Sequence, residues 1–141
     1  MDVTMDEAAL AAFLAEAFPQ VAGDFGVEAI TPDGLLVRLI VNDGHLRPGG
    51  TVSGPAMFAL ADVAIYLAIL SRIGPQALAV TTNCSIDFMR KPPAGAPLIC
   101  RARLLKLGRV LAVGDAMIFA EGSEDRPMAR ASLTYSIPPD R

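Results

Sequence analysis

The hydrophobic positions of this chain change their spacing from one stretch to the next, and one long stretch is interrupted by a single acid. Residues 53–70 read SGPAMFALADVAIYLAIL, with Asp62 as their one charged side chain. A helix that is apolar on every side must be covered on every side. The pattern therefore predicts a buried central helix, about Gly54–Ser71, around which the rest of the chain folds.

Shorter hydrophobic patterns flank this stretch. Over residues 6–18 apolar side chains recur at helical spacing and Pro19 follows, so we expect a short amphipathic helix. Two β-rich runs, 25–30 and 34–41, flank the turn sequence Thr-Pro-Asp-Gly and predict a hairpin. Further strand-like runs follow the central helix: 77–89, 98–106, 110–121 and 128–137. Short links rich in turn residues connect them, which favours antiparallel pairing of consecutive strands.

This order of elements predicts an α+β fold, in which one curved antiparallel sheet wraps around the long central helix and a short N-terminal helix lies outside. With 141 residues, the chain is expected to form a single domain, residues 1–141. A single layer around a helix leaves a sheet edge and some apolar surface uncovered. We therefore expect the chain to self-associate as a homodimer or a homotetramer, a choice that the sequence leaves open.

Composition narrows the functions that this fold can carry. Hydrophobic residues make up 52% of the chain and charged residues 19%, which argues against a disordered protein. The formal net charge is -3 without a basic block, so we expect no nucleic-acid partner. The N-terminal residues show no signal-peptide pattern, and Asp62 in the centre of the apolar stretch argues against membrane insertion. These features predict a cytoplasmic protein that binds a small ligand.

Metal and serine-hydrolase chemistry are not expected. Cys84 and Cys100 lack a metal-binding spacing and lie in strand-like runs, which predicts small buried side chains. His45 is the one histidine of the chain and lies in a turn-rich loop, where a surface or capping role is more common than substrate contact. The sequence contains no G-x-S-x-G nucleophile motif. We expect neither a metal ion nor a separate cofactor.

Asp62 is the first candidate for chemistry, because a carboxylate in an apolar helix is costly without a partner or a function. It is either a structural carboxylate paired across an interface or a general base or nucleophile. Gly54 is the second candidate, because an N–H at a helix start lacks an intrahelical acceptor and can hold a developing oxyanion. Ser53 can cap the same helix. Gly54 and Asp62 lie roughly 12 Å apart along the helix axis, so one substrate can use both only if two subunits supply them.

The strand predicted at residues 77–89 has a polar face. Strict alternation places four polar side chains on one side of it: Thr81, Asn83, Ser85 and Asp87. They form either a solvated outer surface or a wall of the site. Arg90 and Lys91 end this strand, either as phosphate-binding cations or as part of a solvated rim.

Three segments together resemble the hotdog-fold thioesterases of the phenylacetic-acid-degradation (PaaI-like) family: residues 45–62 (HLRPGGTVSGPAMFALAD), 81–92 (TTNCSIDFMRKP) and 104–109 (LLKLGR). The resemblance extends from about Gly34 to Ile137. The family carries His-Gly-Gly at the start of the central helix and an Asp nine residues after the His. Here that spacing runs from Ser53 to Asp62.

The resemblance implies a hotdog fold and an acyl-CoA thioesterase, with CoA present only as part of the substrate. It implies that Asp62 is the catalytic carboxylate, which activates water or attacks the thioester. It further implies that Gly54 N–H of the facing subunit is the oxyanion donor and that Thr81 positions the water. The acyl group is then expected against apolar helix residues such as Phe58 and Tyr66. The remaining predicted substrate-binding residues are Arg47, Ser53, Asn83, Arg90 and Lys91.

Two positions depart from the family pattern. Ser53 stands where the family usually has His, and Arg47 stands where many members have Asn. Ser53 can still cap the helix, and Arg47 can meet a carboxylate or phosphate of the ligand. The departures favour one alternative, a non-catalytic acyl-CoA or acyl-carrier binding module. The other alternative is a hotdog hydratase, with His45 as the histidine that such enzymes use beside the acid.

Overall fold

The computed structural model describes residues 2–139, and the predicted domain of residues 1–141 also includes Met1, Asp140 and Arg141, which lie outside the described residues. The described elements are α1 (Glu7–Ala17), α2 (Pro19–Ala22), β1 (Phe25–Thr31), β2 (Gly34–Leu39), α3 (Gly54–Ile73), β3 (Val80–Phe88), β4 (Leu98–Leu107), β5 (Leu111–Ala120) and β6 (Ala129–Ser136). A short 3-10 turn, Asp43–His45, lies between β2 and α3. The predicted order of helices and strands is confirmed.

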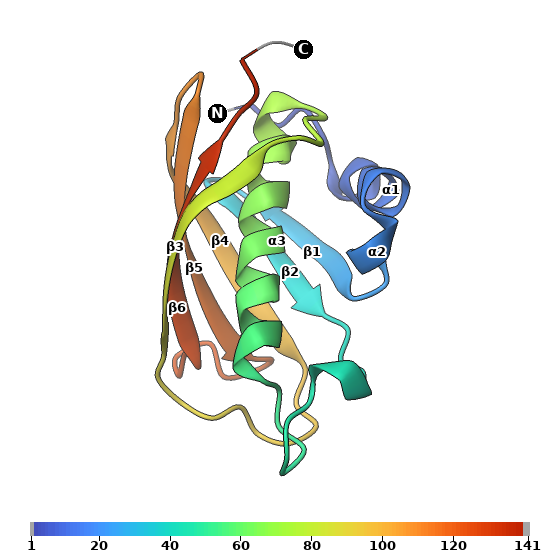
Figure 1. Cartoon of the computed structure of the whole chain (residues 1–141), viewed down its shortest axis with the longest axis vertical. Coiled ribbons are helices and arrows are strands. Elements are labelled where there is room, and N and C mark those ends of the chain that lie inside the picture. Colours follow the sequence, from blue (N-terminus) through green and yellow to red (C-terminus); the bar gives the residue numbers. More distant parts are fainter. Residues whose placement is uncertain (1, 140–141) are drawn as a thin grey trace.

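The strands form one six-stranded antiparallel sheet in the order β1-β2-β4-β5-β6-β3, which curves around α3 (Figure 1). The prediction that consecutive strands pair is wrong at one place, because β3 pairs with β6 and not with β4. The link between β3 and β4 contains Pro92, Pro93 and Pro97, which lack the N–H donors of a tight hairpin. This link passes along the end of the sheet (Figure 1), and β3 becomes an edge strand.

α3 lies on the concave side of the sheet and forms the centre of the core (Figure 1). Ser53 caps its start, because Ser53 Oγ accepts a hydrogen bond from Ala56 N–H at 3.3 Å. Its large side chains, such as Leu60 and Leu67, are fully buried. α3 is long and apolar enough to span a membrane, since an 18-residue window within it has a mean hydropathy of 1.8. However, 78% of this window is buried inside the protein. This burial is typical of the core helix of a globular protein.

The two N-terminal helices pack on the β1 side of α3 (Figure 1). Asp6 caps α1, since its carboxylate accepts a hydrogen bond from Ala9 N–H at 2.9 Å, and Leu10 is fully buried. Pro19 ends α1 as predicted, but it also begins α2, because proline fits the first turn of a helix. The junction of the two helices brings Phe18 against Tyr66 of α3.

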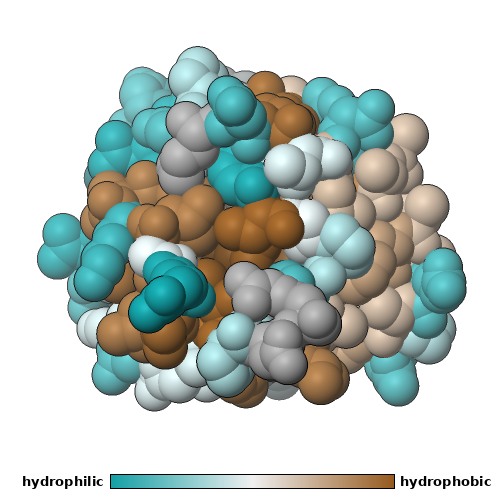
Figure 2. All heavy atoms as spheres, turned by 90° about the horizontal axis from the view of Figure 1, so that it is seen from above, coloured by the Kyte–Doolittle hydropathy of each residue, from teal (hydrophilic) through white to brown (hydrophobic). Residues whose placement is uncertain are grey.

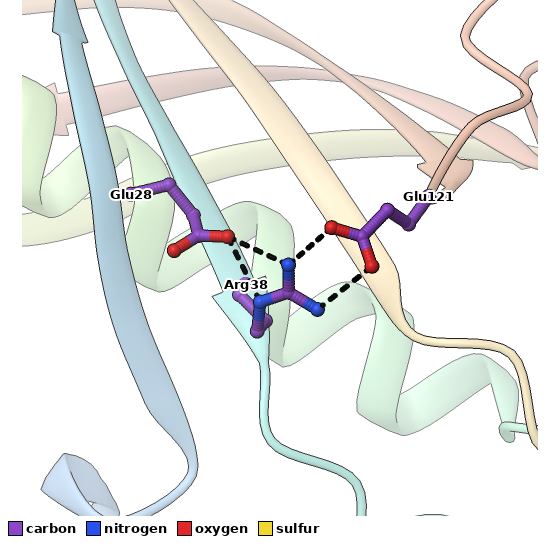
Figure 3. A network of polar contacts seen from close by, with 3 residues as sticks. All are labelled: Glu28, Arg38 and Glu121. Atoms are coloured by element: carbon purple, nitrogen blue, oxygen red, sulfur yellow. Dashed lines mark hydrogen bonds and ion pairs between the residues drawn. The ribbon is translucent and has the colours of Figure 1, made fainter.

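The convex face of the sheet carries ion pairs. Figure 3 shows Arg38 of β2 between Glu28 of β1 and Glu121, which follows β5. Arg38 Nε donates to Glu28 Oε1 at 2.9 Å, and its two terminal nitrogens bond to Glu121. The hydrogen bond from Arg38 lowers the pKa of Glu121. This network ties one end of the sheet together across its outer surface.

The edge strand β3 has exposed hydrophobic side chains along and beside it. Leu78 is 81% exposed, Val80 57% and Phe88 51%. Seen from the end at which α3 terminates, hydrophobic residues occupy much of the surface, with hydrophilic residues scattered around the rim (Figure 2). An edge strand with apolar flanks is a surface to which a second chain can add.

Candidate active site

Asp62 lies in the middle of α3, and its carboxylate meets hydroxyl groups from β3 and β6. Asp62 Oδ1 accepts a hydrogen bond from Thr81 Oγ1 at 2.5 Å and another from Tyr135 OH at 2.8 Å. Tyr135 OH also lies 3.0 Å from the backbone oxygen of Asp62. No residue between positions 2 and 139 donates a hydrogen bond to Asp62 Oδ2. Because a carboxylate oxygen accepts about two hydrogen bonds, Oδ1 is fully used and Oδ2 is available for chemistry.

Thr81 reaches Asp62 because β3 is irregular where it pairs with β6. Thr81 pairs with Tyr135 and Asn83 pairs with Thr134, so Thr82 is an extra residue on β3. A β-bulge of this kind turns one side chain to the other face of the sheet. The prediction from strict alternation is therefore wrong for Thr81, which faces the helix, whereas three residues remain exposed on the strand: Asn83, Ser85 and Asp87.

The groups that surround the carboxylate carry no charge at neutral pH. Burial, and after it the charge of Asp62, raises the pKa of the Tyr135 phenol far above its usual range. The same two causes, in the same order, raise the pKa of the Cys84 thiol. Burial also raises the pKa of Tyr66, whose OH donates to the backbone oxygen of Ala77 at 3.1 Å. Asp62 thus faces two neutral hydroxyl donors and a neutral thiol.

The carboxylate opens into a pocket of about 510 Å³ between α3, the start of β3 and the junction of α1 with α2. Aromatic rings form one wall of the pocket. The rings of Phe18 and Tyr66 meet edge to face with centroids 6.4 Å apart, and the centroids of Tyr66 and Tyr135 are 6.2 Å apart. The wall continues to the carboxylate, because Tyr135 bonds to Asp62. This shape suits an apolar group whose reactive end lies at Asp62.

A second pocket, of about 360 Å³, lies at the start of α3. Its lining includes Gly54 and three cationic residues: Arg47, Arg90 and Lys91. Within residues 2–139, the Gly54 N–H has no hydrogen-bond acceptor. The Phe88 ring covers Gly54 so closely that a Cβ at position 54 would lie 3.3 Å from it. The lining of this pocket shares no residue with the Asp62 pocket, so a single chain keeps Gly54 and Asp62 in two separate places.

The thioesterase superfamily matches residues 49–126, a range that contains α3 with Asp62 and β3 with Thr81. This chain belongs to the thioesterase superfamily.

Solved structures of thioesterase-like proteins confirm the hotdog fold and the likeness to PaaI. A thioesterase candidate from Silicibacter sp. TM1040 is 55% identical, with 99% of this chain and 96% of the other covered and a TM-score of 0.91. The phenylacetic acid degradation protein PaaI from Thermus thermophilus, solved as a point mutant, is 30% identical, with 85% and 99% covered and a TM-score of 0.71. A Streptococcus mutans protein solved with bound acetyl-CoA shares the fold at 24% identity, with 83% and 90% covered and a TM-score of 0.70.

Some predicted residues of this thioesterase-superfamily chain lie outside both pockets. His45 holds the turn before α3, because its Nδ1 accepts a hydrogen bond from Asn42 N–H at 3.0 Å and its Nε2 lies 3.4 Å from Asp24 Oδ2. Phe58 is 39% exposed and lies one turn before Asp62 on α3. Asn83 is exposed on β3. Of these three, only Phe58 lies near Asp62 along the helix.

Among the residues of the Asp62 pocket that sequence reasoning missed, two are aromatic, Tyr135 and Phe18. Tyr135 follows Asp62 by 73 positions, and no spacing rule connects them. The one sequence feature that points to Tyr135 is its residue type, because the chain contains only two tyrosines and both lie in this pocket. Phe18 could be read only as part of an amphipathic helix. Among residues 2–139, no group of three or more His, Cys, Asp or Glu side chains is placed to hold a metal ion.

Proposed function

We propose that this protein is an acyl-CoA thioesterase, which hydrolyses a thioester to a free acid and coenzyme A. One observation carries the proposal: Asp62 has Oδ1 held by two hydroxyls and Oδ2 free, at the end of an apolar pocket. Membership of the thioesterase superfamily supports thioester hydrolysis, and the acetyl-CoA bound to the Streptococcus mutans structure supports CoA as the thiol.

In the reaction, Asp62 acts on the thioester carbonyl in one of two ways. As a general base, Oδ2 takes a proton from water while the water oxygen attacks the carbonyl carbon; the C–S bond then breaks, and the proton passes to the departing thiolate. As a nucleophile, Oδ2 attacks the carbonyl carbon itself, the thiolate leaves, and water hydrolyses the resulting anhydride. Thr81 orients the water, because its oxygen can accept a hydrogen from water while its own proton is donated to Asp62.

The proposed enzyme works as a dimer. Gly54 and Asp62 occupy separate pockets of one chain, roughly 12 Å apart along α3. A donor and a base that serve one carbonyl must each lie about 3 Å from the reacting atoms. Gly54 of the partner subunit therefore supplies the oxyanion donor opposite Asp62. The exposed edge of β3 and its apolar flanks, including Val80 and Phe88, support association along this strand.

The substrate is divided between the two kinds of pocket. The acyl group lies against Tyr66 beside Asp62, with Phe58 at the subunit interface. The CoA phosphates lie near the start of α3, where three cations surround the second pocket: Arg47, Arg90 and Lys91. Ser53 contributes by capping the helix whose first N–H groups face the substrate. The hydratase alternative loses support, because both ring nitrogens of His45 are engaged within its own loop and with Asp24.

The decisive experiment is a thiol-release assay with short, long and aryl CoA esters on the wild type and two variants, Asp62→Asn and Asp87→Asn. Asp62→Asn keeps an oxygen that can accept from Thr81 and Tyr135 but removes the acid–base group, so turnover should fall at least about 100-fold. Asp87→Asn is the matched control, because Asp87 pairs with Arg130 on the outer face of β3, and it should retain wild-type turnover.

Two outcomes would reject the proposal. Unchanged turnover in Asp62→Asn would remove the carboxylate from the mechanism. No thiol release from any ester, together with CoA binding measured by calorimetry, would instead favour the non-catalytic binding module.

A further inference from the structure

Tyr135 contacts the carboxylate of the proposed active site but has no role in the mechanism proposed above. It lies on the inner face of β6 and is only 3% exposed. In the ladder, Tyr135 pairs with Thr81 of β3 on one side and with Ala112 of β5 on the other. A side chain on a strand with neighbours on both sides is held more firmly than one on a loop, which is the arrangement that positions functional groups.

The contacts of the Tyr135 hydroxyl determine which oxygen of Asp62 is free. The hydroxyl lies 2.8 Å from Asp62 Oδ1 and 3.0 Å from the backbone oxygen of the same residue. It therefore fixes the side chain relative to its own helix backbone. Thr81 donates to the same oxygen, Oδ1, at 2.5 Å. With both donors on Oδ1, the carboxylate cannot exchange its two oxygens by rotation without breaking two hydrogen bonds.

We infer that Tyr135 is a positioning residue, which together with Thr81 holds Asp62 Oδ1 so that Oδ2 is the atom that reacts. The inference rests on the proposed thioesterase function and adds to it the identity of the reacting oxygen. Tyr135 does not touch the substrate carbonyl and acts through Asp62.

The charge state of the neighbouring groups agrees with this role. The titratable groups that face the carboxylate are Tyr135 of β6, Cys84 of β3 and, one turn further along α3, Tyr66. The pKa of each is raised, with burial as the main cause, so each keeps its proton at neutral pH. A phenol that stays protonated is a permanent donor, and a donor to the ionised form of a carboxylate favours that form.

The test compares Tyr135→Phe with Thr82→Val. Each variant loses one hydroxyl of the paired strands β3 and β6, but the Thr82 hydroxyl donates to the backbone oxygen of Thr134 and not to Asp62. In Tyr135→Phe, kcat for thiol release should fall about 10- to 100-fold, the scale of a lost hydrogen bond to a charged group. The KM should stay within about threefold, because the substrate does not touch this hydroxyl.

Two further measurements separate positioning from a merely structural role. In Tyr135→Phe, a crystal structure should show the Asp62 carboxylate in more than one orientation, because only Thr81 still holds Oδ1. In Thr82→Val, the carboxylate should keep its single orientation and kcat should equal that of the wild type. Unchanged kcat in Tyr135→Phe, or a lower kcat with the carboxylate in its wild-type orientation, would overturn the inference.

The crystal structures also separate this inference from the proposed function. If the wild type releases no thiol from any CoA ester, thioester hydrolysis is rejected. The orientation of the Asp62 carboxylate in Tyr135→Phe then still decides whether the Tyr135 hydroxyl holds it. If the wild type is active and Asp62→Asn is inactive, the thioesterase mechanism stands, and Tyr135→Phe alone decides the role of Tyr135.

Discussion

Gly114 of β5 allows α3 to lie close against the sheet, and Gly114→Ala tests how tightly the helix and its carboxylate are held. A Cβ at position 114 would stand 2.7 Å from Ile65 Cδ1 and 2.8 Å from the backbone oxygen of Arg103. Ile65 is fully buried, and Arg103 belongs to the β4 ladder, so neither can move aside freely. Overpacking of this kind costs about 1–3 kcal/mol, which for a chain of this size lowers Tm by about 3–10 °C.

The measurement is urea and thermal unfolding followed by circular dichroism, with Gly23→Ala as the matched control. A Cβ at Gly23 meets no atom within 4 Å and its φ is -72°, so that alanine should be neutral or stabilising by up to about 1 kcal/mol. Ile65 lies one helical turn beyond Asp62, so Gly114→Ala should also lower thiol release by shifting Asp62 away from its hydroxyl donors. Equal stability of the two variants would refute the close packing of α3 on β5.

Two further predictions concern the subunit interface and the ion pairs of the outer face. Phe88→Asp should give a monomer with little thiol release, because it puts a charge at the end of the edge strand β3. Analytical ultracentrifugation and the activity assay measure the two effects. The control Met117→Asp lies on the outer face of the sheet and should remain dimeric. A dimeric Phe88→Asp would contradict association along β3. Glu121→Gln should destabilise the protein at neutral pH. Arg38 lowers the folded-state pKa of Glu121, so the stability that this ion pair contributes is complete above the unfolded-state pKa of Glu121 and disappears as the pH falls through its folded-state pKa. Urea unfolding should therefore show the difference between wild type and variant vanishing below about pH 4, whereas a difference independent of pH would show that charge is not its cause.

The helices and strands could be read from the sequence because their signals are local. Gly74 marks the end of the apolar run, and the observed end of α3 is within a few residues of it. The turn at Pro32 and Asp33 likewise separates β1 from β2. Their pairing is not local. β3 lies beside β6, although the first residue of β6 comes 41 positions after the last residue of β3. No local rule distinguishes β6 from β4 as the partner of β3. The α+β class was therefore accessible from the sequence, and the strand order was not.

The candidate site divides in the same way. Asp62 was conspicuous because an acid in an apolar helix contradicts its surroundings, and Gly54 because it begins that helix. Thr81 was proposed through a resemblance, while its orientation depends on an extra residue, Thr82, that alternation alone cannot reveal. Tyr135 could not be connected to Asp62 at all, because their contact is created by the strand order. Candidates that stand out by their own chemistry were visible in the sequence, and a candidate defined by its contact with another residue required the fold.

The junction of α1 with α2 has a consequence for the evolution and engineering of substrate choice. Phe18 lines the Asp62 pocket but comes from a segment that precedes residues 49–126, the part matched by the superfamily. Asp62 and Thr81 come from within that part. In the proposed enzyme, the chemistry and one wall of the acyl pocket are thus encoded in separate stretches of the gene. Exchange of the N-terminal helices offers a modular route to new acyl preferences that leaves the reacting carboxylate in place.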